Sequence, residues 1–481
     1  MSNEYDVVVI GAGPPGENVA DRAVKGGLTA VIVESELVGG ECSYWACMPS
    51  KALLRPVAAV AEASEIQGVS GARLDPPPVL ARRDTFTSNW KDDGQVGWLN
   101  GAHVDLVRGH ARLTGPRAVS VGPAPAAAFP AGTVSGSTPA AGTRELRARH
   151  AVVVATGSRA LIPPVRGLGD VRPWTSREAT SAHEVPKRLA IIGGGVVGCE
   201  MAAAWQALGA QVTLLVREER LLERVEDFAG EMVADGLSAA GVDVRLGITV
   251  TAAERPSAGG PVSLLCENGT WLEAEEVLVA TGRVPRTDDL GLETVGLTPG
   301  SWLDVDGTCQ VTGVDGGWLY GVGDVNHLAL LTHMGKYQAR ICGDAIAARA
   351  KGKEPAATAW ANQSAVPQVI FTVPEVAAVG PSSAQARQAG RHIRVVDYDI
   401  GSVAGASLFA DGYAGRARMV VDEDSRTMIS ATLAGPGVGE LIHAATVAVA
   451  GQVPLDQLWH AVPSYPTISE IWLRLLEAYG L

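Results

Sequence analysis

Cysteine is scarce in this chain, with six residues in 481. A small secreted scaffold held together by disulfides needs a far higher density, so that class of protein is excluded. Four cysteines stand singly, and we expect them to behave as small buried hydrophobic side chains. These are Cys199, Cys266, Cys309 and Cys342. Only Cys42 and Cys47 lie close together, and in a cytoplasmic protein such a pair favours catalysis or metal binding.

The chain also lacks any run of about eighteen apolar residues, so no membrane span is expected. It lacks a basic stretch of the kind that follows phosphates, and its formal net charge is −13. Nucleic acid is therefore not an expected partner. The start, MSNEYDVVVIGAG, enters a predicted strand without a basic n-region or a long apolar h-region. The cytoplasm is the default expectation for location.

Hydrophobic residues make up 47% of the chain and charged residues 19%, which is typical of a well-packed globular protein. At this length roughly two to four domains are expected.

A glycine-rich turn opens the first predicted βαβ unit, YDVVVIGAGPPGENVADRAVKGGLTAVIVE, residues 5–34. Gly11, Gly13 and Gly16 have the spacing GxGxxG directly after an apolar strand, and Glu34 ends the second strand. Glycines there permit a tight turn and close approach to a pyrophosphate, and the terminal acid accepts hydrogen bonds from a ribose. The stretch therefore predicts a dinucleotide site.

The same pattern returns in KRLAIIGGGVVGCEMAAAWQALGAQVTLLVR, residues 187–217, with Gly193, Gly195 and Gly198 in the same frame. Two such units predict two dinucleotides, which is what a flavoprotein supplied by a nicotinamide needs.

The second unit differs from the first at the end of its second strand. Val216 takes the place that Glu34 has in the first unit, and Arg217, Arg220 and Arg224 follow it. An arginine there suits a 2′-phosphate, so we expect NADPH, with NADH as the alternative. The other interpretation is a solvated charged loop, VREERLLERVED, whose acids offset its bases.

Two further apolar strands run into Ala-Thr-Gly, in AVVVATGSRALIPP and EEVLVATGRVPRTDDLGL. We expect them to cross between the nucleotide domains, with Thr156, Gly157 and Gly282 beside the cofactors. A third strand, WLYGVGDVN, ends in Gly-Asp, and a helix is expected to start near His333. Asp324 is placed to bond a ribityl or pyrophosphate group, or else to serve as a plain N-cap.

Residues 121–145, VGPAPAAAFPAGTVSGSTPAAGTRE, have almost nothing to bury and predict an extended, mobile hairpin or loop insertion without chemistry.

The close cysteine pair lies in GGECSYWACMPSK, residues 39–51. A zinc site would need two further ligands, and no second paired Cys or His motif is present. No metal site is predicted, and a redox pair is favoured over a static disulfide. Tyr44 and Trp45 lie between the sulfurs, where they either stack on a flat substrate or, as aromatic side chains usually do, fill space by packing.

In order and spacing these motifs resemble the pyridine nucleotide-disulfide oxidoreductases, the family of dihydrolipoamide dehydrogenase, glutathione reductase and mercuric reductase. The resemblance rests on GAGPPG, GGECSYWACMPSK, ATGS, GGGVVGCE, ATGR and YGVGD, and covers nearly the whole chain. Near the C-terminus, VPQVIFTVPEVAAVG and VPSYPTISE resemble the interface domain.

The resemblance implies an α/β fold with two Rossmann-like dinucleotide-binding domains, one for FAD and one for NAD(P), and a C-terminal α+β dimerisation domain. The expected division is 1–158 for the first part of the FAD domain, 159–283 for NAD(P), 284–355 for the central and second FAD part, and 356–481 for dimerisation. A homodimer is expected.

The resemblance also implies that Cys42 and Cys47 form a redox-active disulfide beside the flavin. Hydride passes from nicotinamide to flavin, and electrons then reduce the disulfide. Cys47 is then the thiolate that contacts the flavin, and Cys42 attacks the substrate. A helix start at this point would lower the thiol pKa, which agrees with these roles. Gly40 and Lys51 would lie close to the flavin, and Glu200 would lie by the nicotinamide, where it could pair with Lys51.

The chain departs from the family near its end. The disulfide reductases carry a His-Pro-Thr stretch with a Glu five residues after the His, and that His, given by the other subunit, moves protons. Here Tyr465 occupies the His position, Glu470 keeps its place, and His460 does not align. A histidine exchanges protons readily near pH 7, whereas a tyrosine phenol is a poor base there.

We therefore expect an FAD-dependent NAD(P)H oxidoreductase that acts on a small disulfide or dithiol. Mercuric reductases resemble this chain at Tyr465, because that branch places a tyrosine at the same point. The end LRLLEAYGL, however, lacks the terminal cysteine pair of that branch. A metal-ion or quinone reductase without the histidine base, and a flavin-bound redox sensor, remain the alternatives.

Overall fold

A computed structural model describes residues 2–124 and 142–481, and the chain divides into two compact units. The first comprises Met1–Pro49, Asp84–Arg159 and Arg283–Gln363. The second comprises Ser50–Arg83, Ala160–Gly282 and Ser364–Leu481. The predicted division into four domains stays a prediction.

A seven-stranded sheet forms the centre of the first unit. Its strands are β1 (Glu4–Ile10), β2 (Ala30–Glu34), β3 (Asp105–Arg108), β4 (His110–Gly115), β5 (Ala118–Gly122), β6 (Arg144–Val154) and β16 (Leu319–Gly321). The strand order is β3-β2-β1-β6-β5-β4, with β16 paired to β6. β3, β2, β1, β6 and β16 are parallel, whereas β4 and β5 are antiparallel additions. The side chains of β1 are almost all buried, as a parallel strand covered on both faces requires.

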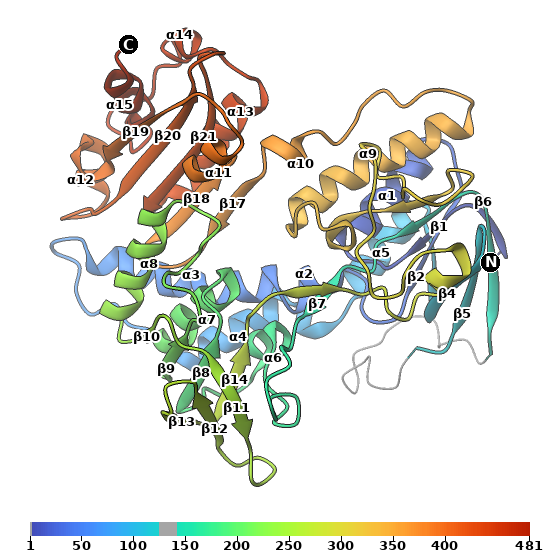
Figure 1. Cartoon of the computed structure of the whole chain (residues 1–481), viewed down its shortest axis with the longest axis horizontal. Coiled ribbons are helices and arrows are strands. Elements are labelled where there is room, and N and C mark those ends of the chain that lie inside the picture. The colour runs from blue at the N-terminus through green and yellow to red at the C-terminus, as the bar shows by residue number, and fades with distance from the viewer. Residues whose placement is uncertain (1, 125–141) are drawn as a thin grey trace. The chain divides into compact units, whose positions relative to one another are not determined.

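Two helices lie along each other in this unit although they are far apart in sequence. They are α1 (Pro14–Lys25) and α9 (Thr332–Ala350), seen in blue and gold in Figure 1. The close approach depends on small residues: a Cβ on Gly343 would lie 2.5 Å from Cβ of Arg22, and one on Gly335 would lie 2.7 Å from the ring of Pro15. The predicted helix start near His333 is confirmed.

The other helices of this unit are α2 (Gly40–Tyr44), the start of α3 (Cys47–Ser64), and α5 (Asp93–Gly101). β5 and β6 pair antiparallel on either side of the predicted insertion, so a hairpin is present. Most of the predicted mobile part, residues 125–141, lies outside the described residues.

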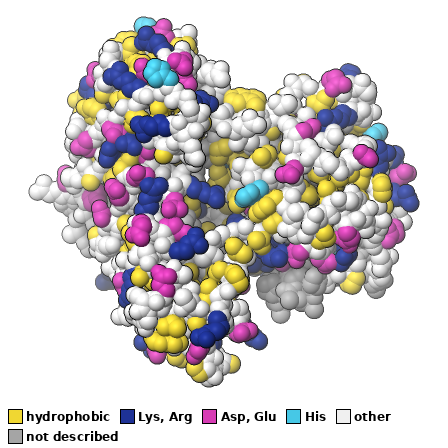
Figure 2. Space-filling model, in the orientation of Figure 1, with side chains coloured by type: hydrophobic (Ala, Val, Ile, Leu, Met, Phe, Trp, Pro, Cys, Tyr) yellow, Lys and Arg dark blue, Asp and Glu magenta, His cyan; other side chains and the backbone are white. Residues whose placement is uncertain are grey.

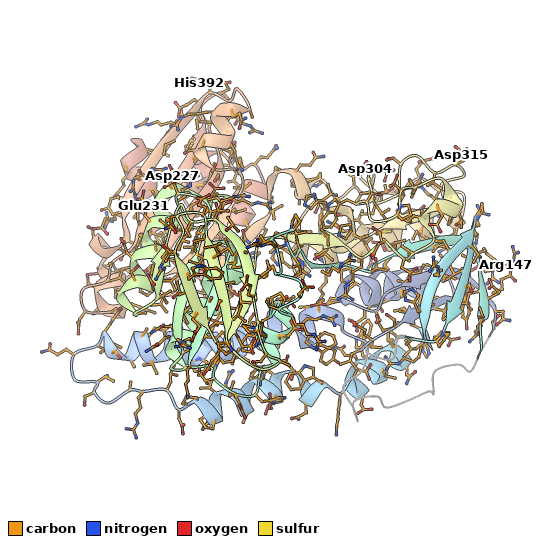
Figure 3. All side chains as sticks on the ribbon, turned by 60° about the horizontal axis from the view of Figure 1, so that its bottom comes forward. Arg147, Asp227, Glu231, Asp304, Asp315 and His392 are labelled. Carbon is orange, nitrogen blue, oxygen red and sulfur yellow. The ribbon has the colours of Figure 1, made fainter. Side chains whose placement is uncertain are left out.

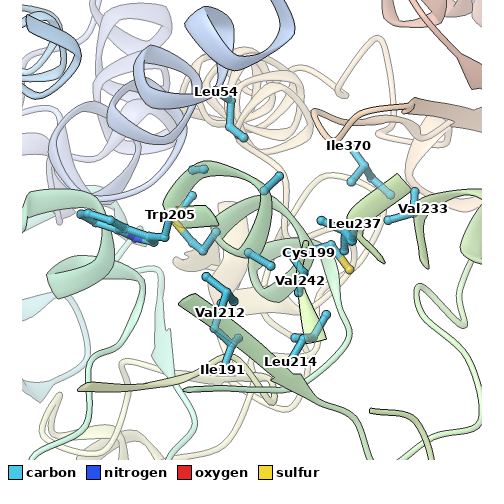
Figure 4. Close-up of a cluster of buried hydrophobic side chains, with 14 of the residues drawn as sticks. Leu54, Ile191, Cys199, Trp205, Val212, Leu214, Val233, Leu237, Val242 and Ile370 are labelled. Carbon is cyan, nitrogen blue, oxygen red and sulfur yellow. The ribbon is translucent and has the colours of Figure 1, made fainter. Parts of the chain in front are cut away.

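The second unit contains another parallel sheet, in the order β10-β9-β8-β14. Its strands are β8 (Arg188–Ile192), β9 (Gln211–Leu215), β10 (Asp243–Arg245) and β14 (Glu276–Val279). Helices α6 (Ser176–Ser181), α7 (Val196–Ala207) and α8 (Asp227–Ala239) accompany it, as does the three-stranded antiparallel sheet of β11 (Val250–Glu254), β12 (Val262–Cys266) and β13 (Trp271–Ala274). Figure 4 shows Cys199 and Trp205 of α7 packed among apolar side chains of this core.

The C-terminal part of the second unit is an antiparallel sheet in the order β17-β18-β21-β20-β19. Its strands are β17 (Pro367–Ile370), β18 (Glu375–Val379), β19 (Ile393–Asp399), β20 (Arg416–Asp422) and β21 (Thr427–Gly435). Its helices are α11 (Ser383–Gln388), α12 (Ala404–Phe409), α13 (Ile442–Ala450), α14 (Leu455–Leu458) and α15 (Glu470–Tyr479). The mainly parallel sheet of the first unit, the parallel sheet of the second unit and the C-terminal antiparallel sheet with its helices confirm the predicted fold class.

Side chains of both charges are interspersed over the face of the molecule drawn in Figure 2. Among the helices of residues 2–124 and 142–481, none combines the length and apolar character needed to cross a bilayer. All four single cysteines are at most 2% exposed, as predicted.

Candidate functional site

The first glycine turn joins β1 to α1 and has no room for a side chain at Gly11 or Gly16. Gly11 has φ of +103°, and a Cβ there would lie 2.5 Å from the carbonyl oxygen of Ala155. A Cβ on Gly16 would lie 2.0 Å from the carbonyl oxygen of Gly11. At Gly13 the nearest atom to a Cβ is 3.9 Å away, so space is left at the mouth of the turn. The turn therefore has the shape that a pyrophosphate needs.

Glu34 ends β2, as predicted, and its side chain is 8% exposed. Its Oε2 accepts a hydrogen bond from the Ala12 N–H (2.6 Å), and its Oε1 accepts one from the Glu36 N–H (2.7 Å). Burial raises the pKa of Glu34, and these two hydrogen bonds oppose the rise. Each carboxylate oxygen keeps a second lone pair, which suits a ribose hydroxyl.

The segment that carries Cys42 is fixed from two sides. Asp92 Oδ2 accepts hydrogen bonds from the Val38 N–H (2.8 Å) and from Arg108 Nη2 (2.6 Å). The side chains of Asp92 and Arg108 are 0% and 1% exposed, and loss of one partner of such a buried ion pair costs about 3–5 kcal/mol. Downstream, a Cβ on Gly40 would lie 2.8 Å from Cα of Gly13, so this segment runs directly beside the glycine turn.

Arg286 makes a further link to this segment. Its guanidinium pairs with Glu41 (2.7 Å) and Glu36 (3.4 Å), and its backbone N–H donates to the Gly157 carbonyl (3.0 Å). A positive charge is thereby placed among acids that surround the glycine turn.

The two close cysteines occupy different helices. Cys42 lies in the short helix α2, and Cys47 is the first residue of α3. Cys47 Sγ lies 3.2 Å from Oγ1 of Thr332, which is the first residue of α9. The start of a second helix therefore faces the Cys47 sulfur, and helix N-termini stabilise negative charge.

Tyr44 and Trp45 are packed, as predicted. They are 2% and 7% exposed, and their ring centroids lie 5.7 Å apart. The Tyr44 hydroxyl donates to the Val38 carbonyl (3.0 Å), and Trp90 Nε1 donates to the Tyr44 carbonyl (3.2 Å). This aromatic cluster, completed by Leu37, holds the segment between the cysteines in shape.

Asp324 lies just after β16. It accepts a hydrogen bond from the Ser158 hydroxyl (2.5 Å), and Arg283 Nε lies 3.8 Å away. Burial raises the pKa of Asp324, with Ser158 and Arg283 opposing the rise. The N-cap interpretation is wrong, since Val322 and Leu331 hold the cap positions of the helices here.

These residues fit FAD. The turn at Gly13 is open, and Thr156 Oγ1, in the predicted Ala-Thr-Gly, is buried without a hydrogen-bond partner among the described residues. Gly157 has φ of +72°, so only a residue without a side chain adopts this turn readily. No cluster of three metal-ligating side chains occurs within residues 2–124 and 142–481.

The second glycine turn, in the other unit, repeats the first. A Cβ on Gly193 would lie 2.5 Å from the Ala280 carbonyl oxygen, and one on Gly198 would lie 1.9 Å from that of Gly193. Among the described residues, no atom lies within 4 Å of a Cβ on Gly195, and Gly282 has φ of +150°. The mouth of this turn is therefore open as well.

The basic residues after β9 are partly paired. Val216 is fully buried, whereas the Arg217 side chain is 76% exposed and pairs with Glu218 (2.6 Å). Arg220 pairs with Asp227. Asp227 is the first residue of α8 and is labelled in Figure 3.

Lys51 and Glu200 form the pair that the sequence suggested, with Nζ 2.7 Å from Oε2. Glu200 is 3% exposed, and its Oε1 accepts a hydrogen bond from the Phe371 N–H (3.1 Å). The ammonium of Lys51 lies 5.0 Å from the Phe371 ring centroid, so α3, α7 and the end of β17 meet at this charge.

Tyr465 is 77% exposed in the single chain. Glu470 begins α15 and is 5% exposed, and its Oε2 has no hydrogen-bond partner among the described residues. Arg474 lies 3.6 Å from the other carboxylate oxygen.

Three residues of these sites escaped the sequence interpretation: Thr332, Arg286 and Phe371. A polar residue at the start of a predicted helix was the available signal for Thr332. Arg286 and Phe371 act across long sequence separations, and no local pattern marks them.

Comparison with known proteins agrees with this geometry. Residues 5–352 match the pyridine nucleotide-disulphide oxidoreductase family, and residues 366–475 match its dimerisation domain. Dihydrolipoyl dehydrogenase 3 of Pseudomonas aeruginosa is 33% identical over 482 residues, with 98% of this chain and 97% of that protein covered. Mercuric reductase of Staphylococcus aureus is 27% identical, with 97% and 81% covered.

Solved structures share the fold. The flavoprotein disulfide reductase RclA of Escherichia coli, as its Cu(II) complex, has a TM-score of 0.82 at 23% identity, and 99% of each chain is covered. LpdA of Mycobacterium tuberculosis has a TM-score of 0.83 at 23% identity, and all of both chains is covered. This chain therefore belongs to the pyridine nucleotide-disulphide oxidoreductases, and is a homodimeric, FAD-dependent disulfide oxidoreductase.

Proposed function

We propose that the enzyme uses NADPH to reduce a small disulfide through the Cys42–Cys47 pair. The observation that carries the proposal is the position of Cys47, at the start of α3 and 3.2 Å from Thr332 at the start of α9. Both lie in the unit that holds the first glycine turn. FAD, when bound, accepts two electrons from the nicotinamide and supplies them to the cysteine pair.

Cys42 is the attacking residue in this proposal. Its thiolate attacks one sulfur of the substrate disulfide and releases the first product thiol, leaving a mixed disulfide. The Cys47 thiolate then attacks the Cys42 sulfur and releases the second product thiol. The two electrons of the dithiol pass to the substrate, the Cys42–Cys47 bond forms, and the product thiols take up two protons.

The remaining site residues hold the cofactors. We assign Gly11, Gly13, Gly16, Glu34, Gly40, Lys51, Thr156, Gly157 and Asp324 to FAD. We assign Gly193, Gly195, Gly198, Glu200, Arg217 and Gly282 to the nicotinamide dinucleotide. The ion pair of Lys51 and Glu200 fixes the Lys51 ammonium, and Tyr465 and Glu470 line the substrate side.

Counting thiols tests whether electrons pass through the Cys42–Cys47 pair. Anaerobic NADPH should raise the number of thiols that react with a chromogenic disulfide in the denatured enzyme by two per chain. Cys42→Ser and Cys47→Ser should show no rise, and Cys266→Ser should behave as the wild type. If the wild type consumes NADPH without any rise in thiol number, the proposal that electrons pass through Cys42 and Cys47 is overturned.

The nucleotide preference rests on Arg217. Its side chain is exposed and directly follows Val216, the residue that takes the place of Glu34 in the second unit, and a charged hydrogen bond to a 2′-phosphate contributes about 1.5–3 kcal/mol. We expect Arg217→Ala to lower kcat/KM for NADPH about 10- to 100-fold and to leave kcat/KM for NADH within about twofold. Arg188→Ala, which removes a paired arginine on β8, is the control. Equal loss with both nucleotides would contradict the preference.

A second candidate is a metal-ion or quinone reductase. Tyr465 in place of the histidine base favours it, because such acceptors take electrons without a proton-shuttling imidazole. RclA, which shares the fold, is known as a Cu(II) complex. This candidate would be favoured if the wild type reduced Cu(II) or a quinone but did not reduce any small disulfide. Loss of Cu(II) turnover in Cys42→Ser would assign it to the thiols rather than to the flavin.

A further inference from the structure

The first turn of α1 is short of hydrogen-bond donors. Pro14 and Pro15 occupy its first two positions, and proline has no N–H. The unpaired N–H groups of a first helical turn are what such a helix offers to an anion. This turn therefore presents two fewer donors to a diphosphate than a sequence without these prolines would.

Glu17 lies in α1 close to these two prolines, which lack N–H donors. It follows Gly16, is 7% exposed, and its Oε1 is buried without a hydrogen-bond partner among the described residues. Helical side chains lean toward the N-terminus of their helix, so the carboxyl group of Glu17 covers the first turn of α1. An unpaired buried polar group costs about 1–3 kcal/mol, which a bound ligand recovers if it supplies the partner.

The surroundings of Glu17 decide its charge. Its electrostatic neighbours are Glu34 from β2, Tyr44 from α2 and Lys336 from α9. Burial raises the pKa of Glu17 to about 7, Glu34 adds to the rise, and Lys336 opposes it. Near neutral pH a large share of the carboxyl groups therefore keeps its proton and offers an O–H donor.

We propose that protonated Glu17 is a binding residue for FAD and donates a hydrogen bond to its phosphate oxygens, in place of a proline-blocked backbone donor. The ionised form instead confronts the diphosphate with a like charge. FAD affinity therefore decreases as pH rises. The proposal concerns cofactor binding alone and stands whether or not Cys42 and Cys47 carry electrons.

The test measures the Kd of FAD for the apoprotein by quenching of flavin fluorescence between pH 6 and pH 8. If only the protonated form binds, the wild-type Kd rises about tenfold over this range. Glu17→Gln keeps a donor and has no proton to lose, so its Kd should stay constant and near the wild-type value at pH 6. Glu17→Leu should bind more weakly at pH 6, without dependence on pH.

Asp21→Asn is the matched control, because Asp21 lies one turn further along α1 and pairs with Lys25. It should keep the wild-type pH dependence. A wild-type Kd that is constant from pH 6 to pH 8 overturns the proposal without any variant. A tenfold rise that persists in Glu17→Gln, or Glu17→Leu binding as tightly as wild type at pH 6, overturns it as well.

Discussion

Cys42→Ser is expected to lower turnover of a small disulfide by about a thousandfold or more, because a serine hydroxyl does not exchange with a disulfide. FAD content and the rate at which NADPH reduces the enzyme should stay within about twofold of wild type, since Cys42 lies in α2 and not in either glycine turn. Steady-state kcat with a disulfide acceptor and rapid-mixing reduction by NADPH measure the two quantities separately.

Cys309→Ser serves as the control for this substitution. Cys309 is fully buried, and burial raises the pKa of its thiol to about 12, so it does not supply a nucleophile at neutral pH. Its replacement should leave disulfide turnover unchanged if the protein folds. Retention of full disulfide turnover in Cys42→Ser would show that the electrons leave from elsewhere.

Tyr465→His is expected to raise turnover of a dithiol or disulfide substrate near pH 7 by about a hundredfold, the lower end of what a positioned general acid–base contributes. We expect Glu470 to orient the imidazole, and its buried Oε2, which has no hydrogen-bond partner among the described residues, could accept the ring N–H. The pH profile of kcat should gain a limb near pH 6.5, the ordinary pKa of a histidine.

Two further variants serve as controls for Tyr465→His. Tyr465→Phe should leave turnover within about twofold of wild type, because it keeps the ring and removes only the hydroxyl. Tyr465→His combined with Glu470→Gln should lose most of the gain. If Tyr465→His changes neither the rate nor the pH profile, position 465 is not where protons enter and leave the substrate.

Local chemistry made much of the first unit predictable. Gly11 and Gly16 of GAGPPG stand where only glycine fits, and Glu34 ends β2, because strand, turn and helix are determined within about thirty residues. The burial of Tyr44 and Trp45 followed from the general tendency of aromatic side chains to pack.

Residues that enter the site through contacts between distant parts of the sequence were not predictable. Thr332 contacts Cys47 although the two residues are far apart in the sequence, and the same holds for Arg286 and Glu41. A single sequence contains no local sign of such pairs. Asp324 shows a different limit: spacing allowed both an N-cap and a ligand-facing acid, and only the observed helix starts, capped by Val322 and Leu331, excluded the N-cap.

The packing of α9 along α1 has a consequence for biosynthesis. The ribosome makes the first glycine turn at the very start and makes α9 only after the chain between Lys25 and Thr332. At ordinary rates of translation that delay is roughly fifteen seconds to a minute. Until then α1 lacks the helix that buries its outer face, and β6 lacks β16 as its neighbour. The packing of the first unit is therefore completed only after the ribosome has made α9, which ends at Ala350 of the 481-residue chain.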